Sequence, residues 1–241
     1  MSGYNCFVDV HSHILPHMDD GSRSMEMSLN MMKIAYEEGI RTIITTPHNM
    51  PGKGYADIEH VNSRIEELTA KSHEAGIDIV LKPGSELYYR EEIPRLIEEN
   101  KVVKMNGKRF VLVEFEPVND SRYIINDLKN VMNTGMTPIV AHVERYPSLW
   151  DKKLENIAAI SDMGCYIQMN ASTITGKLGF SMRRMVNRLL KEQLVDFIGT
   201  DAHSDRNRAP RIAACADYLY KKCSKSYADS MLFGLAEDIL L

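Results

Sequence analysis

Seven short runs of apolar residues recur along the chain. They are rich in valine and isoleucine and do not alternate with polar residues, which is typical of parallel strands that are covered on both faces. This pattern predicts seven strands, at residues 6–10, 41–46, 77–82, 110–115, 137–141, 165–169 and 195–200.

Stretches with apolar residues three and four positions apart separate these runs and predict helices. Residues 24–38 follow this spacing, and Gly39 comes next as a stop signal. The same reasoning predicts helices at 57–75, 91–99, 121–133, 151–163 and 181–193, and two final helices at about 211–221 and 226–240.

Strict alternation of strand and helix favours a parallel sheet in an α/β fold. Seven such units in 241 residues suggest a closed, distorted (β/α)7 TIM-like barrel, with residues 1–241 as a single domain. An open doubly wound sheet is the alternative, because periodicity cannot show closure.

Composition narrows the class of protein. Lysine and arginine number 29 against 33 acidic residues, a net charge of −4, so we expect no nucleic-acid partner. The four cysteines form no C-x-x-C pair, which indicates a reducing compartment. No apolar run approaches about 18 residues and no signal segment begins the sequence, so we expect no membrane insertion and a cytoplasmic location.

Histidine and acidic residues gather just past the ends of the predicted strands, including five of the eight histidines. In parallel barrels this rim carries the active site. Histidine and carboxylate without thiolate suit zinc, manganese or iron, and the number of candidates favours two or three ions that share a carboxylate. The candidate ligands are His11, His13, Asp20, His48, Glu86, Glu114, His142, Asp201 and His203. Asp19 is an alternative to Asp20 as a ligand. Whichever of the two does not bind metal would cap the helix that follows.

Two arginines lie close to these residues in the sequence. Arg145 follows His142 by three positions, and Arg208 follows His203 by five, with Arg206 as the fallback. A guanidinium beside a multi-metal site suits the oxygens of a phosphate. The alternative is that Arg145 only pairs with a neighbouring acid. No G-x-S-x-G or cysteine phosphatase motif is present, so we expect no covalent phosphoenzyme.

These motifs resemble a known family. The segments DVHSHILPHMDDG, TTPH, GSELYY, LVEFEP, AHVERY and GTDAHSDRNRAP are similar to the polymerase-and-histidinol-phosphatase (PHP) superfamily, and within it to the bacterial protein-tyrosine phosphatases of the CpsB/YwqE type. The resemblance extends from Asp9 to about Pro210.

The resemblance implies a distorted seven-stranded β/α barrel, the PHP fold, and a three-metal site. One metal would be held by His11, His13 and Asp201, with Glu86 as the bridge to a second. Glu114 and His142 would complete the second site, and Asp20, His48 and His203 would hold the third. Arg145 and Arg208 match the family's phosphate-contacting arginines, although the segment DRNRAP leaves the choice between Arg206 and Arg208 open.

Manganese is the usual activator of this branch, with iron, zinc or magnesium as alternatives. The implied function is hydrolysis of phosphotyrosine on the C-terminal tail of a cytoplasmic tyrosine kinase that regulates capsular or exopolysaccharide synthesis. The alternatives are a small-molecule phosphatase of the histidinol-phosphatase kind and a non-catalytic regulator that docks phosphotyrosine. A homo-oligomer remains an open expectation.

Overall fold

The computed structural model describes residues 6–51, 57–151, 153–175 and 179–241. Within them all strand pairs are parallel, as predicted. The strands are β1 (Phe7–Ser12), β2 (Ile40–Thr45), β3 (His48–Asn49), β4 (Val80–Lys82), β5 (Glu86–Tyr88), β6 (Phe110–Glu114), β7 (Thr137–Val140), β8 (Tyr166–Asn170) and β9 (Phe197–Gly199). They form a three-stranded sheet, β1-β2-β4, and a six-stranded sheet, β3-β5-β6-β7-β8-β9.

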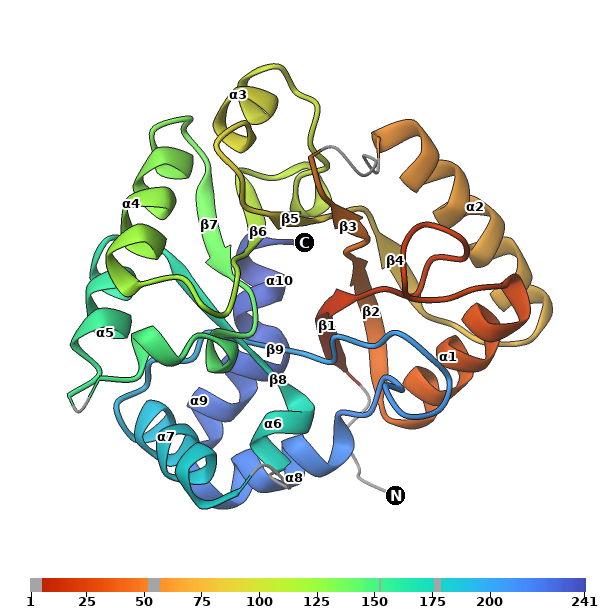
Figure 1. Ribbon diagram of the computed structural model, residues 1–241. Coiled ribbons are helices and arrows are strands. Elements are labelled where there is room, and N and C mark those ends of the chain that lie inside the picture. Colours follow the sequence, from red (N-terminus) through yellow and green to blue (C-terminus); the bar gives the residue numbers. More distant parts are fainter. Residues whose placement is uncertain (1–5, 52–56, 152, 176–178) are drawn as a thin grey trace.

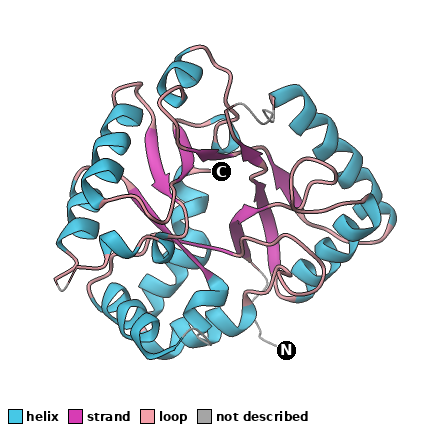
Figure 2. Cartoon of the chain, viewed as in Figure 1, coloured by secondary structure: helices cyan, strands magenta, loops and turns pink. Residues whose placement is uncertain are grey.

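The parallel sheet is curled, and most of the helices lie around its outside (Figures 1 and 2). The first and last strands meet where their chains leave the sheet. The backbone N–H of His13 donates to the carbonyl of Ala202 over 2.9 Å, and that of Asp201 donates to the carbonyl of His11 over 2.7 Å. These bonds bring the segments that follow β1 and β9 together, where several of the predicted metal ligands lie.

The described residues contain nine short strands, so the predicted count of seven is not confirmed. The two extra strands arise where prolines interrupt the ladder. Pro47 separates β2 from β3, and Pro83 separates β4 from β5. Proline has no N–H to donate to a neighbouring strand, a constraint that the apolar pattern does not reveal.

The helices surround the sheet largely where periodicity predicts them. They are α1 (Met25–Glu37), α2 (Ile58–Glu74), α3 (Ile93–Glu98), α4 (Ser121–Met132), α5 (Glu155–Asp162), α6 (Ala171–Thr175), α7 (Gly179–Lys191), α8 (Ala213–Lys222), α9 (Lys225–Asp229) and α10 (Leu235–Ile239). The expected helix at 151–163 starts later because Leu154 has a left-handed φ of 61°. No helix among the described residues is long and apolar enough to cross a bilayer.

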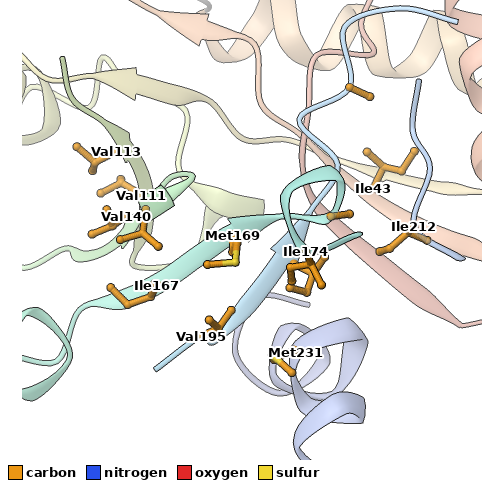
Figure 3. Packing of buried hydrophobic residues seen from close by; sticks show 14 of the residues in the cluster. Ile43, Val111, Val113, Val140, Ile167, Met169, Ile174, Val195, Ile212 and Met231 are labelled. Atoms are coloured by element: carbon orange, nitrogen blue, oxygen red, sulfur yellow. The ribbon is translucent and has the colours of Figure 1, made fainter. Parts of the chain in front are cut away.

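Both faces of the sheet are apolar, which explains why the strand sequences do not alternate. A large cluster packs between the strands and the outer helices; Figure 3 shows part of it, including Val111, Val140 and Ile167. A smaller cluster includes Val8 and Val10 of β1 and Leu240 beside α10. Figure 1 places α10 and the C terminus among the strands, so the chain end helps to fill the space that the sheet curls around.

One partly buried carboxylate, that of Asp196, bonds to a strand of the sheet and takes no part in the cluster of histidine and acidic residues. Asp196 Oδ2 accepts a hydrogen bond from the backbone N–H of Ile167 over 2.8 Å. Burial raises the pKa of Asp196 to about 6. A carboxyl group whose pKa is raised on folding makes the native state less stable as the pH rises from its unfolded value, near 4, to its folded value.

We therefore expect Asp196→Asn to raise the midpoint of thermal unfolding at pH 8, because asparagine keeps an acceptor for Ile167 and removes the charge. The gain should vanish below about pH 4, where aspartate is neutral in both states. Thermal unfolding of both proteins at a series of pH values checks this. A variant that is less stable at pH 8 would contradict it.

Candidate metal centre

All nine predicted ligands come together at the carboxyl ends of the strands. His11 is the next-to-last residue of β1, and Glu114 ends β6. His48 and Glu86 start the short strands β3 and β5, just past the ends of β2 and β4, and the others follow their strands. Two of them need an unusual backbone: φ is 31° at His142 and 52° at Asp201. Such a conformation is costly for residues other than glycine, so the surrounding structure must hold these two residues in place.

The first group is built around two imidazoles. His11 Nε2 and His13 Nε2 lie 3.2 Å apart. Glu86 Oε2 lies 3.3 Å from the first nitrogen and 3.2 Å from the second. Asp201 Oδ1 is 3.7 Å from each of them. Two nitrogens and two carboxylate oxygens therefore face one small volume.

The second group uses the other oxygen of Glu86. His142 Nε2 lies 2.9 Å from Glu86 Oε1 and 3.3 Å from Glu114 Oε1. The hydroxyl of Tyr146 is 3.3 Å from the other ring nitrogen of His142 and accepts a hydrogen bond from the backbone N–H of Phe115. This tyrosine positions the imidazole, a role that the sequence reasoning missed.

The third group lies nearest to solvent. Asp20 Oδ1 is 3.5 Å from both His48 Nε2 and His203 Nε2, and the Asp20 side chain is 68% exposed. The rings of His13 and His203 lie 3.9 Å apart, centre to centre. His48 also approaches the other two groups, because its Nδ1 is 3.1 Å from Glu86 Oε2 and 3.8 Å from Glu114 Oε2.

Four combinations of these residues place one donor atom each within 4.8 Å of one another. They are His13, Asp20, His48 and His203; His11, His13 and Asp201; His11, Glu86 and His142; and His48, Glu86 and Glu114. The second combination reproduces one site expected from the resemblance, and the first contains the expected third site together with His13. The other two combinations each contain Glu86 but add His11 or His48 to residues expected in the second site. The ligand assignment itself stays a prediction.

The donor set fits divalent cations. His13 Nδ1 is 2.6 Å from Asp19 Oδ2, and His203 Nδ1 is 3.0 Å from the carbonyl of Asp201. Both acceptors require N–H on Nδ1, so each Nε2 is left to face the centre. His48 Nδ1 is buried and has no hydrogen-bond partner, although a carboxylate oxygen is near. A cation would satisfy these lone pairs together.

The pKa shifts of the buried groups also favour a site for cations. The imidazoles of His11, His13 and His142 hold the pKa of Glu86 well below its usual range, against the effect of burial. Burial lowers the pKa of His13, but its hydrogen bonds to Asp19 and Glu86 raise it overall to about 10. Burial, with the charge of His13, lowers the pKa of His203 to about 4. The buried carboxylates thus attract positive charge, which metal ions can supply in exchange for protons.

Asp19 orients ligands rather than capping the next helix. Its carboxylate accepts hydrogen bonds from the His13 ring and from the backbone N–H groups of Gly21 and His48. The cap of α1 is Ser24, whose hydroxyl accepts from the N–H of Met27. The expected capping role for an acid of the DD pair is therefore wrong.

The arginines meet the centre at Asp201. Arg145 pairs with Asp201 Oδ2, and Arg208 lies 2.7 Å from Asp201 Oδ1. Arg145 is also 3.8 Å from Glu114. The side chain of Arg206 is 88% exposed and approaches only Asp205, at 4.0 Å. Of the two arginines in the DRNRAP segment, the geometry therefore favours Arg208 for contact with an anion at the centre.

Two amides on β8 link three ligands that come from other strands. Gln168 Oε1 accepts from the backbone N–H of His142 over 2.7 Å and lies 3.1 Å from His11 Nδ1. Gln168 Nε2 donates to Asn170 Oδ1 over 3.0 Å, and Asn170 Nδ2 donates to Asp201 Oδ2 over 2.9 Å. Because the N–H of His142 needs an acceptor, the amide orientation is fixed, and His11 must carry its proton on Nδ1.

Comparison with known proteins identifies the family. The family described as "Capsular polysaccharide synthesis, CpsB/CapC" matches residues 7–241. The chain belongs to this family. A relative in the CpsB/CapC family, the tyrosine-protein phosphatase CpsB of Streptococcus agalactiae serotype III, is 32% identical over 240 residues, which cover 97% of this chain and 98% of the relative.

Solved structures agree with the CpsB/CapC assignment. Crystal structures of YwqE from Bacillus subtilis and CpsB from Streptococcus pneumoniae, described as unique metal-dependent tyrosine phosphatases, match with a TM-score of 0.84 and 25% identity. That match covers 92% of this chain and 89% of the other. A histidinol phosphate phosphatase from Lactococcus lactis matches with a TM-score of 0.60 and 17% identity, covering 90% and 93% of the two chains. At that identity the second likeness concerns the fold alone.

The amide network generates a prediction about metal affinity. We expect Gln168→Ala to weaken binding of Mn²⁺ about 10- to 100-fold, because His11 and the His142 backbone lose their common acceptor. Gln168→Glu keeps that acceptor but loses the donor to Asn170, so it should weaken binding less than Gln168→Ala does. Competition with a fluorescent chelator measures both variants, and circular dichroism monitors folding. Wild-type affinity in a folded Gln168→Ala protein would show that the amide has no such role.

Proposed function

We propose that this protein is a metal-dependent phosphomonoesterase that hydrolyses phosphotyrosine in a protein substrate. One observation carries the proposal: three histidine–carboxylate groups meet at Glu86, with two arginines held against the adjoining carboxylate of Asp201. Membership of the CpsB/CapC family, whose named relatives are tyrosine phosphatases, supports the choice of substrate.

We propose the ligand division implied by the motifs. His11, His13 and Asp201 form one site, Glu114 and His142 form another with Glu86 between the two, and Asp20, His48 and His203 form the third. When bound, divalent ions lower the pKa of water from about 15.7 to near 7 and so supply hydroxide at physiological pH. We favour manganese, with iron, zinc or magnesium as alternatives.

The arginines orient the phosphate and stabilise its charge. Each guanidinium has five N–H donors, and contact with Asp201 uses only part of them. The remaining donors of Arg145 and Arg208 can hold two non-bridging oxygens in place during in-line attack by water. The P–O bond to the tyrosyl oxygen breaks, and tyrosine and inorganic phosphate leave. The phenol, with a pKa near 10, is a moderate leaving group.

The wider setting follows from the same resemblance. We propose that the substrate is the phosphorylated C-terminal tail of a tyrosine kinase that regulates capsular polysaccharide synthesis, and that both proteins meet in the cytoplasm. We further propose that residues 1–241 act as one domain with the PHP fold. In that distorted (β/α)7 barrel, β2 with β3 and β4 with β5 each count as one strand broken by proline.

The decisive experiment is phosphate release by chelator-stripped protein, with and without Mn²⁺. The substrates are a tyrosine-phosphorylated kinase-tail peptide and histidinol phosphate, assayed side by side. We expect manganese-dependent release that favours the peptide. Preference for histidinol phosphate would move the protein to the small-molecule class. Stoichiometric peptide binding without turnover would favour the docking regulator.

His142→Ala and His60→Ala form a matched pair for this assay. His142 is buried beside Glu86, whereas His60 is exposed on α2. We expect His142→Ala to lose nearly all activity together with bound metal, and His60→Ala to keep both. Metal content per chain and the unfolding midpoint separate loss of the site from loss of the fold. Full activity in metal-depleted His142→Ala would sink the proposal.

The two arginines allow a separate prediction. Replacing Arg145 with lysine keeps the charge and removes the planar pair of donors. We expect kcat/KM for a phosphotyrosine peptide to fall about 10- to 100-fold at unchanged metal content. Steady-state kinetics with metal analysis checks this. An undiminished kcat/KM would leave Arg145 as a partner of Asp201 and Glu114 only.

A further inference from the structure

A cavity lies next to the candidate metal centre and shares Asp201 with it. It has a volume of about 310 Å³ and is lined by four arginines, Arg145, Arg206, Arg208 and Arg211. Asp201 is the one acidic residue among those that line it. Because Asp201 also belongs to the metal centre, a group held by Arg145 and Arg208 would sit at the boundary between the centre and this cavity.

The cavity on the other side of the Arg206–Arg208 loop differs in charge. Its volume is about 600 Å³, and three arginines in its lining face three acids, Asp20, Glu26 and Asp205. The lining of the smaller cavity has four arginines and one acid; Arg206 and Arg208 line both cavities, and Glu38 and Asp205 lie near Arg211 and Arg206 without lining the smaller one. In a chain with a net charge of −4, this is a local concentration of positive charge beside the proposed phosphate site.

The four arginines lie at two depths. Arg145 and Arg208 are 39% and 44% exposed, and both hold Asp201. Arg211 is 66% exposed and lies 3.2 Å from Glu38, while Arg206 is 88% exposed. The inner pair thus contacts the centre, and the outer pair lies at the rim with most of its side-chain surface in water.

We propose that the outer pair, Arg206 and Arg211, forms a specificity subsite for an acidic residue that flanks the phosphotyrosine. This inference rests on the proposed function. A phosphotyrosine whose phosphate contacts Arg145 and Arg208 has its peptide backbone at the other end of the aromatic ring, toward the more exposed Arg206 and Arg211. A glutamate or aspartate next in the sequence then meets guanidinium groups at the level of the backbone, and pairs with them.

The expected effect is modest, because exposed ion pairs are weak and are screened by salt. A carboxylate at the correct flank should raise kcat/KM about two- to fivefold over its neutral isostere. The preference should shrink as ionic strength rises. Hydrolysis of the phosphate itself does not require the subsite, so the ratio of the two substrates isolates it.

The test uses manganese-loaded protein and three phosphotyrosine peptides of equal length. One has glutamine at the two positions on each side of the phosphotyrosine. The others carry glutamate in place of the two N-terminal or the two C-terminal glutamines. We expect one glutamate peptide to be preferred by two- to fivefold at low salt, and the preference to fall to about one in Arg206→Gln/Arg211→Gln.

A matched control removes the same charge elsewhere. Arg183 and Arg184 are exposed on α7, outside the lining of the arginine cavity. Arg183→Gln/Arg184→Gln should keep the wild-type ratio, whereas a drop equal to that of the rim variant would mean that only overall charge matters, which overturns the subsite. Equal hydrolysis of all three peptides by the wild type overturns the subsite and leaves the phosphatase standing. Failure to hydrolyse any of them overturns both.

Discussion

The carboxylate of Glu86 is the constraint on which the rest of the site depends. It is 1% exposed, and four imidazoles surround it. Its Oε2 lies 3.1 to 3.3 Å from nitrogens of His11, His13 and His48, and its Oε1 lies 2.9 Å from His142. A buried charge without compensation costs several kcal/mol, so this carboxylate is tolerable only if positive charge lies on both sides of it. That requirement explains why one residue links the groups of donors.

The fold meets this requirement by hydrogen bonds to the predicted ligands on the side facing away from the centre. Nδ1 of His11, His13 and His203 each faces an acceptor that is no predicted ligand side chain: the amide of Gln168, the carboxylate of Asp19 and a backbone carbonyl. Close backbone packing has the same effect. A Cβ on Gly199 would lie 2.6 Å from His11 Cβ, so only glycine lets β9 approach β1 here. Rigid second contacts of this kind hold like charges together before any cation binds.

The clustering of the predicted ligands could be predicted from the sequence for a physical reason. Parallel strands end at one rim, so polar residues that follow apolar runs must gather there, and all nine predicted ligands do. The strand breaks at Pro47 and Pro83 were not predicted, because the pattern of apolar residues does not show where a backbone N–H is missing. The positioning roles of Asp19, Tyr146 and Gln168 were not predicted, because each role depends on a partner that is distant in the sequence and becomes a neighbour only in the folded chain. Gln168 had one available signal, because it is a polar residue within the otherwise apolar run of a strand that supplies no predicted ligand.

The position of Asp201 argues that the anion site and the metal site are one electrostatic unit. Its φ of 52° directs a carboxylate between His11 and His13 on one side and Arg145 and Arg208 on the other. If the arginines were absent, a buried acid would draw its compensation from the metal side alone. If the cations were absent, it would bind the guanidinium groups more tightly and leave fewer donors for phosphate. The charge of Asp201 is therefore shared between the predicted metal side and the two arginines, so a change on either side would alter its interaction with the other.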